Sequence, residues 1–290
     1  MFAPTPYEFG WSADNFGSTW TDAGFGVNCP GHASANTAGA DTNLLNGIAE
    51  DAYGIAICFT GGATAGASRR NLVTILIDPT AGAGNAGSNW QVHILNLFVN
   101  SAAFVGGGYW YYFPMRIAAG TAIGGRNISS TASTSALRVG IKVFGKPKRP
   151  ELCRVAKGVQ SMGYSAPTTI GTAVTMGYKV KGAWTYIGTL NQSRTFWWQI
   201  GMAMNDTSRT INAYLLDIGW SSDGGTTVVP ICENILMTDN TSEQSGKAAV
   251  GDRLPFMDVP VSLDIYARCA CVGGLAGEGN TYLVVYGAYD

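Results

Sequence analysis

Residues that could carry acid–base chemistry are few in this sequence. The 290 residues include two histidines, His32 and His93. His93 alternates with apolar residues in a strand-like run, which is typical of a half-buried sheet residue rather than a general base, and His32 lies in a Pro-Gly-His turn. An enzyme of this size should offer nucleophile, base and electrophile candidates together. The small number of histidines therefore argues against catalysis.

Carboxylates are also sparse where a glycosidase would need a pair of them. Asp78 and Asp217 each end one of two similar apolar runs. A duplicated structural turn explains such a pair more simply than a duplicated active site, so we interpret both as strand-end residues that cap a loop. A hydrolase such as a polysaccharide depolymerase is the least favoured class, because the sequence shows no cluster of carboxylates.

Cofactor motifs are missing from the sequence. It has no Gly-x-Ser-x-Gly elbow, no phosphate-binding loop and no calcium loop, and it has no Cys-x-x-Cys pair of the kind that binds zinc. Its cysteines are Cys29, Cys58, Cys153, Cys232, Cys269 and Cys271. Because Cys269 and Cys271 share one face of a strand, a bond between them is geometrically awkward. We predict buried free thiols, no cofactor and no metal.

Composition narrows the possible partners. Charged residues make up 13% of the chain and the formal net charge is −1. Affinity for nucleic acid comes largely from Lys and Arg that neutralise phosphates, so this balance argues against a nucleic-acid partner. Low charge also weakens repulsion between copies, which favours a homo-oligomer. The first residues lack a basic stretch followed by an apolar run, and no segment reaches the roughly 18 apolar residues of a membrane span, so we expect neither a secretory signal nor membrane insertion.

The elements that must position any site come in two similar sets. Residues 115–126 match residues 257–268 at a constant offset of 142, with Met, an aliphatic residue, Ile and Arg recurring in step. The same offset carries residues 141–145 onto 283–287, and both segments end in an aromatic residue followed by Gly. A period this long is too long for a solenoid and indicates two domains that arose by duplication.

Weaker matches keep the same order along the chain. Residues 37–42 pair with 179–185, residues 52–58 with 195–202, and residues 71–78 with 211–217. These offsets differ by a few residues, which predicts small changes in loop length between the copies.

Short alternating runs such as 91–99 and 137–144, separated by Gly, Asn, Ser and Thr clusters, are typical of strands. Only residues 43–53 and 233–237 could hold a turn or short helix. We predict an all-β fold of two tandem, related antiparallel β-sandwich domains, jelly-roll-like and with six to nine strands each. The predicted parts are an N-terminal arm or start of the first domain at 1–30, a first sandwich at 31–145, a linker at 146–158 and a second sandwich at 159–290.

The predicted linker holds the one dense charge cluster of the chain. Lys146, Lys148 and Arg149 lie beside Pro147 and Pro150. Prolines stiffen the chain and block regular structure, as a short semi-rigid linker requires. Arg154 and Lys157 bring the basic residues of this segment to five. A solvated linker is the simpler interpretation of these five residues, and contact with an acidic neighbour or nucleic acid is the alternative.

Aromatic residues are the best candidates for a binding surface. They gather at Trp90, Tyr109, Trp110, Tyr111, Tyr112 and Phe113 in the first copy and at Trp184, Tyr186, Phe196, Trp197, Trp198 and Trp220 in the second. Neighbours along a strand point to opposite faces, so the rings of one run cannot all enter one core. Some should face a partner, a second domain or a ligand. Our candidate interface or ligand residues are Trp110, Tyr111, Tyr112, Trp197, Trp198, Trp220, Lys146, Lys148 and Arg149.

The segment Phe-Pro-Met-Arg-Ile-Ala-Ala-Gly-Thr-Ala-Ile at residues 113–123, with its echo at 259–268, resembles a segment of the structural proteins of tailed bacteriophages. In that group a similar apolar-Pro-aliphatic-Arg-Ile-Pro-Ala-Gly-Thr stretch precedes the final strand of a β-sandwich. Ala118 replaces the expected proline, and the second copy lacks the Ala-Gly-Thr.

The resemblance implies a non-enzymatic virion component in the tail, baseplate, fibre or head decoration. Such a protein is assembled in the host cytoplasm, in several symmetric copies and with other virion proteins, and no catalytic residue is carried over. The residues themselves leave a second hypothesis open. A pair of carbohydrate- or host-receptor-binding modules, with a host surface glycan as partner, is favoured by the aromatic and Asn-rich strands.

Overall fold

The computed structural model describes residues 8–11, 26–61, 70–100, 109–130, 136–146, 154–163, 171–192, 194–204, 212–239, 258–271 and 280–290. Within these ranges every regular element is a β-strand, and no helix is long and apolar enough to cross a membrane. The all-β prediction is therefore confirmed. Neither place considered for a turn or short helix is helical. A strand ends at Leu45 and an irregular connection with bends fills most of residues 43–53, whereas the strand Val229–Asp239 runs through residues 233–237.

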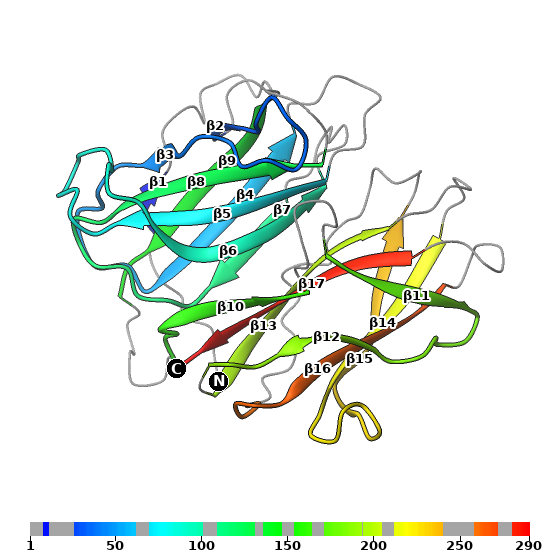
Figure 1. Cartoon of the computed structure of the whole chain (residues 1–290). Helices are drawn as coiled ribbons and strands as arrows, with labels where there is room; N and C mark the ends of the chain where they lie inside the picture. The colour runs from blue at the N-terminus through cyan, green and yellow to red at the C-terminus, as the bar shows by residue number, and fades with distance from the viewer. Residues whose placement is uncertain are drawn as a thin grey trace.

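The first half of the chain forms a sandwich of two antiparallel sheets (Figure 1). Its strands are β1 (Glu8–Trp11), β2 (Val27–Pro30), β3 (Thr42–Leu45), β4 (Gly54–Gly61), β5 (Arg70–Asp78), β6 (Gln91–Asn100), β7 (Tyr109–Phe113), β8 (Ala122–Ser129) and β9 (Ala136–Phe144). One sheet has the order β1-β9-β4-β7, with β2 also paired to β9, and the other has the order β3-β8-β5-β6. The chain crosses repeatedly between the two sheets, which is the jelly-roll arrangement.

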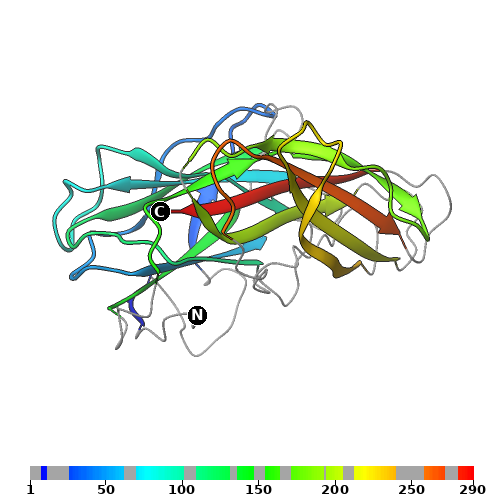
Figure 2. The ribbon, with the colours of Figure 1, turned by 90° about the horizontal axis from the view of Figure 1, so that it is seen from below.

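The second half repeats this design beside the first (Figures 1 and 2). Its strands are β10 (Gly158–Met162), β11 (Thr172–Tyr178), β12 (Thr185–Thr189), β13 (Thr195–Met204), β14 (Asn212–Ser221), β15 (Val229–Asp239), β16 (Asp264–Cys271) and β17 (Asn280–Tyr289). One layer contains β10, β17 and β13, and the other contains β12, β16, β14 and β15. β11 joins the layers, because it pairs antiparallel with β17 and then parallel with β16.

The two sandwiches are topologically equivalent. The order β3-β8-β5-β6 corresponds to β12-β16-β14-β15, and β2-β9-β4 corresponds to β10-β17-β13. Even isolated bridges recur: Ala52 pairs with Ile117, and Thr195 pairs with Val259. The strands that the offset of 142 matches, β8 with β16 and β9 with β17, are partners in this correspondence. Two tandem, related antiparallel sandwiches are therefore present, as predicted.

The strand register corrects one detail of the sequence alignment. Asp217 pairs with Arg268 on β16, while Arg126, the counterpart of Arg268, pairs with Thr74. Asp217 therefore corresponds to Thr74, in the middle of the strand, and the predicted equivalence of Asp78 and Asp217 is wrong. An apolar run that ends in Asp does not fix a register, because a shift of a few residues along the strand preserves that pattern.

Asp78 does cap a loop, as predicted, and Ser221 is its true counterpart. Asp78 accepts hydrogen bonds from the backbone N–H groups of Ser88 at 2.7 Å and Asn89 at 2.8 Å, which tie the following loop to the end of β5. In the second sandwich the Ser221 Oγ accepts a bond from the Gly225 N–H at 2.9 Å. The same place in both copies therefore organises the loop between equivalent strands.

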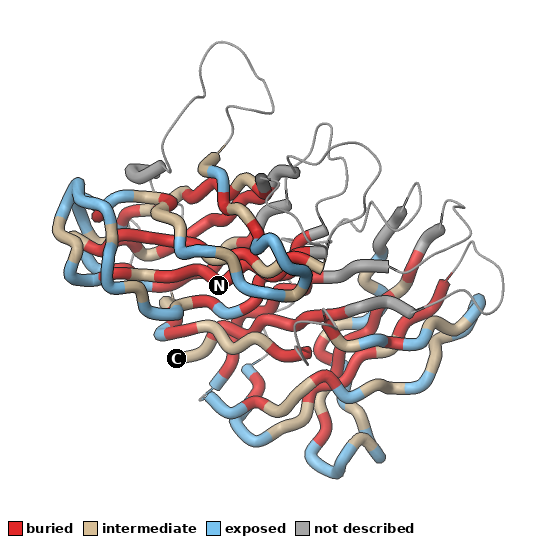
Figure 3. Tube along the Cα trace, turned by 45° about the horizontal axis from the view of Figure 1, so that its top comes forward, coloured by how far each residue is buried: buried red, intermediate tan, exposed pale blue. Residues whose placement is uncertain are grey.

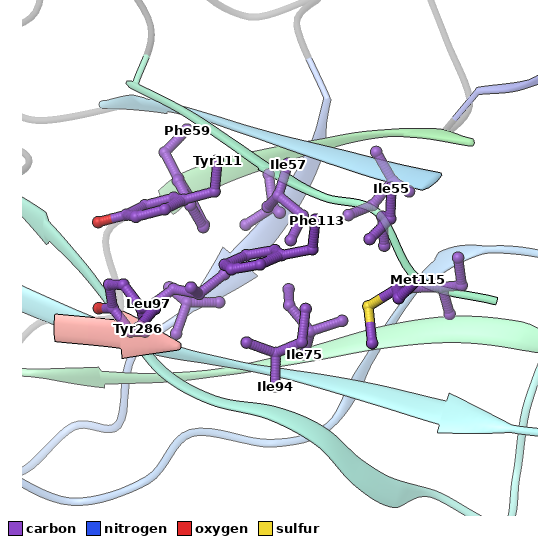
Figure 4. Close-up of a cluster of buried hydrophobic side chains, with 14 of the residues drawn as sticks. Ile55, Ile57, Phe59, Ile75, Ile94, Leu97, Tyr111, Phe113, Met115 and Tyr286 are labelled. Carbon is purple, nitrogen blue, oxygen red and sulfur yellow. The ribbon is translucent and has the colours of Figure 1, made fainter. Parts of the chain in front are cut away.

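Alternation with a period of two builds the first core. Ile55, Ile57 and Phe59 on β4 share one face and are buried. Ile75, Ile94 and Leu97 of the opposite sheet belong to the same core (Figure 4). The rings of Tyr111 and Phe113, on β7 beside β4, stack within it with centroids 6.3 Å apart. The second sandwich has its own core, in which inward residues of β14 and β16 meet.

Side chains of the second sandwich cap the edge of β6. β6 pairs only with β5 among the described strands, so its outer peptide groups need other partners. The Phe98 N–H donates to the Tyr286 hydroxyl at 2.6 Å, and that hydroxyl donates to the Asn96 carbonyl at 2.8 Å. The Phe98 carbonyl accepts a bond from the Tyr111 hydroxyl at 2.6 Å.

The neighbouring edge strand β7 is capped in the same manner. The Tyr112 N–H donates to Gln199 Oε1 at 3.2 Å. The Tyr112 carbonyl accepts bonds from the Trp197 indole at 3.0 Å and from the Gln199 amide. Gln199 thereby serves both peptide groups of one residue, as a neighbouring strand would. We call Tyr286, Gln199 and Trp197, with the edges of β6 and β7 that they cap, the joint.

A β-bulge in β6 aims its carbonyls at the joint. The register between β5 and β6 shifts around Ile75, and Asn96 has a φ of 57°. Asn tolerates this left-handed conformation better than most residues, and a bulge bends its strand locally. The Leu95 carbonyl consequently accepts a bond from the Ser161 hydroxyl on β10, next to the Asn96 carbonyl that accepts from Tyr286.

The joint is also a shared apolar core. Phe196, Trp197, Val284, Tyr286 and Ala288 of the second sandwich belong to the core cluster of the first. Figure 3 shows buried segments of both sandwiches meeting where they touch. The two sandwiches pack closely at Gly201, because a Cβ added there would lie 2.6 Å from the Phe98 Cβ. The two sandwiches therefore share one core, and we expect them to move as one rigid body.

The end of the predicted linker is fixed to the second sandwich. Arg154 forms ion pairs with Asp258 and Asp290, and its guanidinium lies 4.1 Å from the Phe196 ring centroid. The Ala156 N–H donates to the Pro114 carbonyl at 2.6 Å. Residues 154–157 are thus held between both sandwiches rather than solvated, while residues 147–153 lie outside the described part of the chain.

Removing the Tyr286 hydroxyl tests the joint. Tyr286→Phe leaves the buried Phe98 N–H and Asn96 carbonyl without this partner, so we expect the free energy of unfolding to fall by about 2 kcal/mol. Denaturant unfolding measures the loss. Tyr178→Phe is the control, because Tyr178 is 39% exposed and should change stability by less than about 0.5 kcal/mol. Equal stability of both variants would contradict the assignment.

Candidate functional site

Most aromatic residues predicted to bind a partner are internal. Tyr111 and Trp198 are 0% and 2% exposed and fill the two cores, so they offer no surface to a ligand. Tyr112 and Trp197 pack against each other at the joint, with ring centroids 5.7 Å apart. Trp220 packs against the second core. The expectation that some rings face a second domain is met by Tyr112 and Trp197, and the reason is the unpaired edge of β7.

The remaining predicted residues are not brought together. Lys146 is exposed at the end of the first sandwich. The Trp110 side chain, Lys148 and Arg149 lie outside the described residues. His93 is half-buried, and burial lowers its pKa to about 4, which leaves it neutral near pH 7.

The described cysteines are free thiols, as predicted. Cys29, Cys58, Cys269 and Cys271 are buried and Cys232 is half-buried, whereas Cys153 lies outside the described residues. Burial raises the pKa of the Cys29 and Cys58 thiols to about 12 and makes them unreactive. Within the described residues no group of three or more His, Cys, Asp or Glu residues could hold a metal ion.

β12, β16 and β14 are neighbouring strands of one layer (Figure 1). Their outer face presents a more promising group of side chains. Tyr186 on β12 stands directly opposite Tyr266 on β16, and Thr189 stands opposite Asp264. These residues point away from the core, because their neighbours along β16, Ile265 and Ala267, are the ones that enter it. We call Tyr186, Tyr266, Thr189, Asp264 and Asp223 the Tyr186 patch.

Tyr186 is an exposed ring that is held in one orientation. Its side chain is 49% exposed, and its ring meets the Tyr266 ring edge-on with centroids 5.8 Å apart. Its hydroxyl bonds the Thr189 hydroxyl at 2.8 Å, and Thr189 donates to Asp264 Oδ1 at 2.6 Å. A ring fixed in this way loses little side-chain entropy when a ligand stacks on it.

A glycine-containing turn forms the other wall of the patch. Asp223 Oδ1 accepts bonds from the Ser221 hydroxyl at 2.7 Å and the Thr227 N–H at 2.9 Å. The turn packs closely against Tyr266, because a Cβ added at Gly225 would lie 2.8 Å from the Tyr266 ring. The φ of Gly225 is 88°, a backbone conformation that favours glycine. The Asp223 carboxylate is exposed at the rim of the patch.

A charge network lies on the same face, one step along the strands. The fully buried Asp217 carboxylate forms ion pairs with Lys181 and, at 2.8 Å, with Arg268. Arg268 also lies 3.7 Å from Glu233 Oε1 and 4.4 Å from the centroid of the Trp184 ring. This network fixes the segment before β12, and hence the position of the Tyr186 patch.

Electrostatics differ between the two ends of this face. Burial opposes the ionisation of Asp217, but Lys181, the Asn234 N–H and Arg268 outweigh it and lower its pKa. The Thr227 N–H and the Ser221 hydroxyl lower the pKa of Asp223. Burial, followed by the nearby Asp264 carboxylate, raises the pKa of Tyr266. At neutral pH the patch therefore contains an ionised Asp223 and an un-ionised Tyr266.

Sequence reasoning placed Trp184 and Tyr186 among the aromatic residues but did not select them. The sequence pattern could have indicated their position. Trp184 and Tyr186 are two residues apart in a short run, and the apolar Ile187 follows Tyr186. That spacing places both on the face opposite Ile187, which is buried. The longer aromatic runs at residues 109–113 and 196–198 are more conspicuous in the sequence, but their rings fill the cores and the joint.

No protein-family model matches the sequence, and no curated protein matches it significantly. Among solved structures, PNGF-II aligns over 92% of this chain and 65% of its own, with 6% identity and a TM-score of 0.39. The CBM22-1-CBM22-2 tandem domain from Paenibacillus barcinonensis Xyn10C aligns over 99% and 98%, with 13% identity and a TM-score of 0.28. N-glycanase F (PNGase F) aligns over 91% and 95%, with 9% identity and a TM-score of 0.32. The chain thus spans 65% of the length of PNGF-II, and at these TM-scores we draw no functional conclusion.

Substituting Asp217 tests whether its charge network supports this face. Asp217→Asn removes the anion that Lys181 and Arg268 share and leaves Arg268 only its longer contact with Glu233. Since the side chains of Lys181 and Arg268 keep 20% and 28% exposure, we expect a loss of about 2 kcal/mol at pH 7. The pKa of Asp217 is lowered in the folded state, so its contribution is present above the ordinary value of 3.8 and is lost as pH falls.

Unfolding free energies of wild type and Asp217→Asn, measured from pH 7 down to pH 3, give the comparison. The difference should shrink as the pH falls. A difference that stays constant over this range would show that the ionised carboxylate is not what stabilises the fold.

Proposed function

We propose that this chain is a non-enzymatic binding module that recognises carbohydrate through the Tyr186 patch. The observation that carries the proposal is the half-exposed Tyr186 ring, held by Tyr266 and Thr189 beside the Asp264 carboxylate. Jelly rolls occur in lectin domains as well as in viral capsids, so the fold is compatible with this function without establishing it.

The chemistry of the patch matches that of a sugar. A pyranose has an apolar face of C–H groups and a rim of hydroxyls, so it needs an aromatic surface together with polar acceptors. Tyr186 supplies the surface, while the Asp264 and Asp223 carboxylates accept hydrogen bonds. Strands of a rigid body hold all these groups, which reduces the entropy lost on binding.

Replacing the ring should abolish most of the affinity. A glycan array of neutral, amino and acidic oligosaccharides identifies a binder, and titration calorimetry gives its Kd for each variant. Tyr186→Ala should weaken binding by about tenfold or more, which corresponds to about 1.4 kcal/mol. Tyr178→Ala is the matched control, because that tyrosine is exposed on β11 outside the patch. Silence of the whole array, or equal Kd values for both variants, would remove the proposal.

A second candidate is a structural component of a bacteriophage virion. It is favoured by the fusion of two sandwiches into one rigid body through the joint, and by the phage-like segment at residues 113–123. Such a protein assembles through protein–protein contacts. Apolar side chains for them are exposed on β6 and β15, where Val92 is 57% and Leu236 is 60% exposed.

Mass in solution separates the two candidates. Light scattering on the purified chain should give a closed trimer, pentamer or hexamer if the chain is a virion component. A monomer that gains no mass with virion proteins, and that gains stability only with a glycan, would contradict the virion role.

A further inference from the structure

We propose that the sugar bound at the Tyr186 patch carries a protonated amino group, as a deacetylated hexosamine does. This proposal rests on the proposed carbohydrate function and adds the charge of the ligand. Three features support it: the carboxylates of the patch, the unbonded Tyr266 hydroxyl, and the equivalent face of the first sandwich.

The carboxylates of the patch have no cationic partner in the described part of the chain. Asp264 and Asp223 form no ion pair with any described residue. The cations nearest along the strands, Lys181 and Arg268, are already paired with Asp217, and Arg268 also with Glu233. The local balance at Tyr186 is therefore negative, which disfavours uronates, sialates and phosphorylated sugars.

The Tyr266 hydroxyl is a second polar group of the patch that lacks a partner. Tyr266 is 8% exposed, and its hydroxyl forms no hydrogen bond with any residue that the structure describes. It lies against the turn at Gly225, where an added Cβ would come within 2.9 Å of it. Although most of the Tyr266 side chain is buried, its hydroxyl is not one of the buried polar atoms without a partner, so it reaches solvent and can bond an ammonium or hydroxyl group of a ligand.

The first sandwich provides an internal comparison, because its equivalent face is closed. The strand pairing makes Gly124 the counterpart of Tyr266, Asn43 that of Tyr186, and Ala122 that of Asp264. There the chain covers the face with its own Trp90, whose ring would lie 2.8 Å from a Cβ at Gly124. The first sandwich thus covers this face with its own Trp90, whereas the second leaves the Tyr186 ring exposed beside the Asp264 and Asp223 carboxylates.

An ammonium group satisfies all these features at once. A cation is attracted to the face of an aromatic ring, and a charge-assisted hydrogen bond to a carboxylate is stronger than a neutral one. A protonated hexosamine brings that cation together with the apolar ring face that stacks on Tyr186. An N-acetylated hexosamine keeps the ring face and loses the charge.

The experiment compares two ligands that differ in this charge. Titration calorimetry at pH 6 measures the Kd of the full chain for a glucosamine hexamer and for its fully N-acetylated form. We expect the amine form to bind roughly three- to tenfold more tightly, and the preference to shrink at high salt, because the carboxylates are partly exposed. Asp264→Asn and Asp223→Asn should each reduce the preference, while Glu50→Gln, a carboxylate change on the first sandwich, should not.

The outcomes separate the two proposals. Equal affinity for both hexamers, with Tyr186→Ala weakening both, overturns the charge preference and leaves the carbohydrate site intact. Tighter binding of an acidic oligosaccharide overturns the charge preference as well. Binding of neither hexamer nor of any arrayed glycan overturns both proposals.

Discussion

The structure depends on how the edges of the first sandwich are closed. β6 and β7 end their sheets on the same side, and their outer peptide groups would otherwise be unpaired inside the molecule. Among the described residues no further strand pairs with these edges. Instead Tyr286 and Gln199 of the second sandwich supply hydroxyl and amide groups that bond the Phe98 and Tyr112 peptide groups, and the Trp197 indole completes the set. Because polar caps sit inside a shared apolar core, the two sandwiches cannot separate without exposing both.

Because of this constraint, the two copies of the fold use different surfaces for packing and for binding. Surfaces that form the joint cannot bind anything else, so they are packed with the aromatic residues that the sequence makes most visible. The outer face of β12, β16 and β14 lies away from the joint and was free to diverge. In the first copy Trp90 covers the equivalent face, while in the second Tyr186 and the carboxylates around it stay accessible. The proposed binding site is thus found where the duplication is least constrained.

Much of the fold could be predicted from the sequence, because two periodicities determine it. Alternation such as that of Ile55, Ile57 and Phe59 defines strands, and the offset of 142 defines the duplication. Register could not be predicted in the same way. An apolar run that contains an Asp keeps its pattern when it is shifted by a few residues, and only the pairing with β8 and β16 shows that Asp217 corresponds to Thr74 and not to Asp78. The site was harder still. The exposed Tyr186 and the buried Trp198 both lie in short aromatic runs of the sequence. Which of the two rings is covered depends on the elements packed against it, and these cannot be read from the sequence.

Amide hydrogen exchange at Phe98 tests the joint most directly. This N–H points away from β5 and is protected only by the Tyr286 hydroxyl, at 2.6 Å. If the two sandwiches form one rigid body, the Phe98 amide exchanges as slowly as the core amides of either sandwich, and it opens only with global unfolding. Exchange at the rate of an unprotected edge amide, while the cores remain protected, would show that the sandwiches separate in solution and would contradict the account.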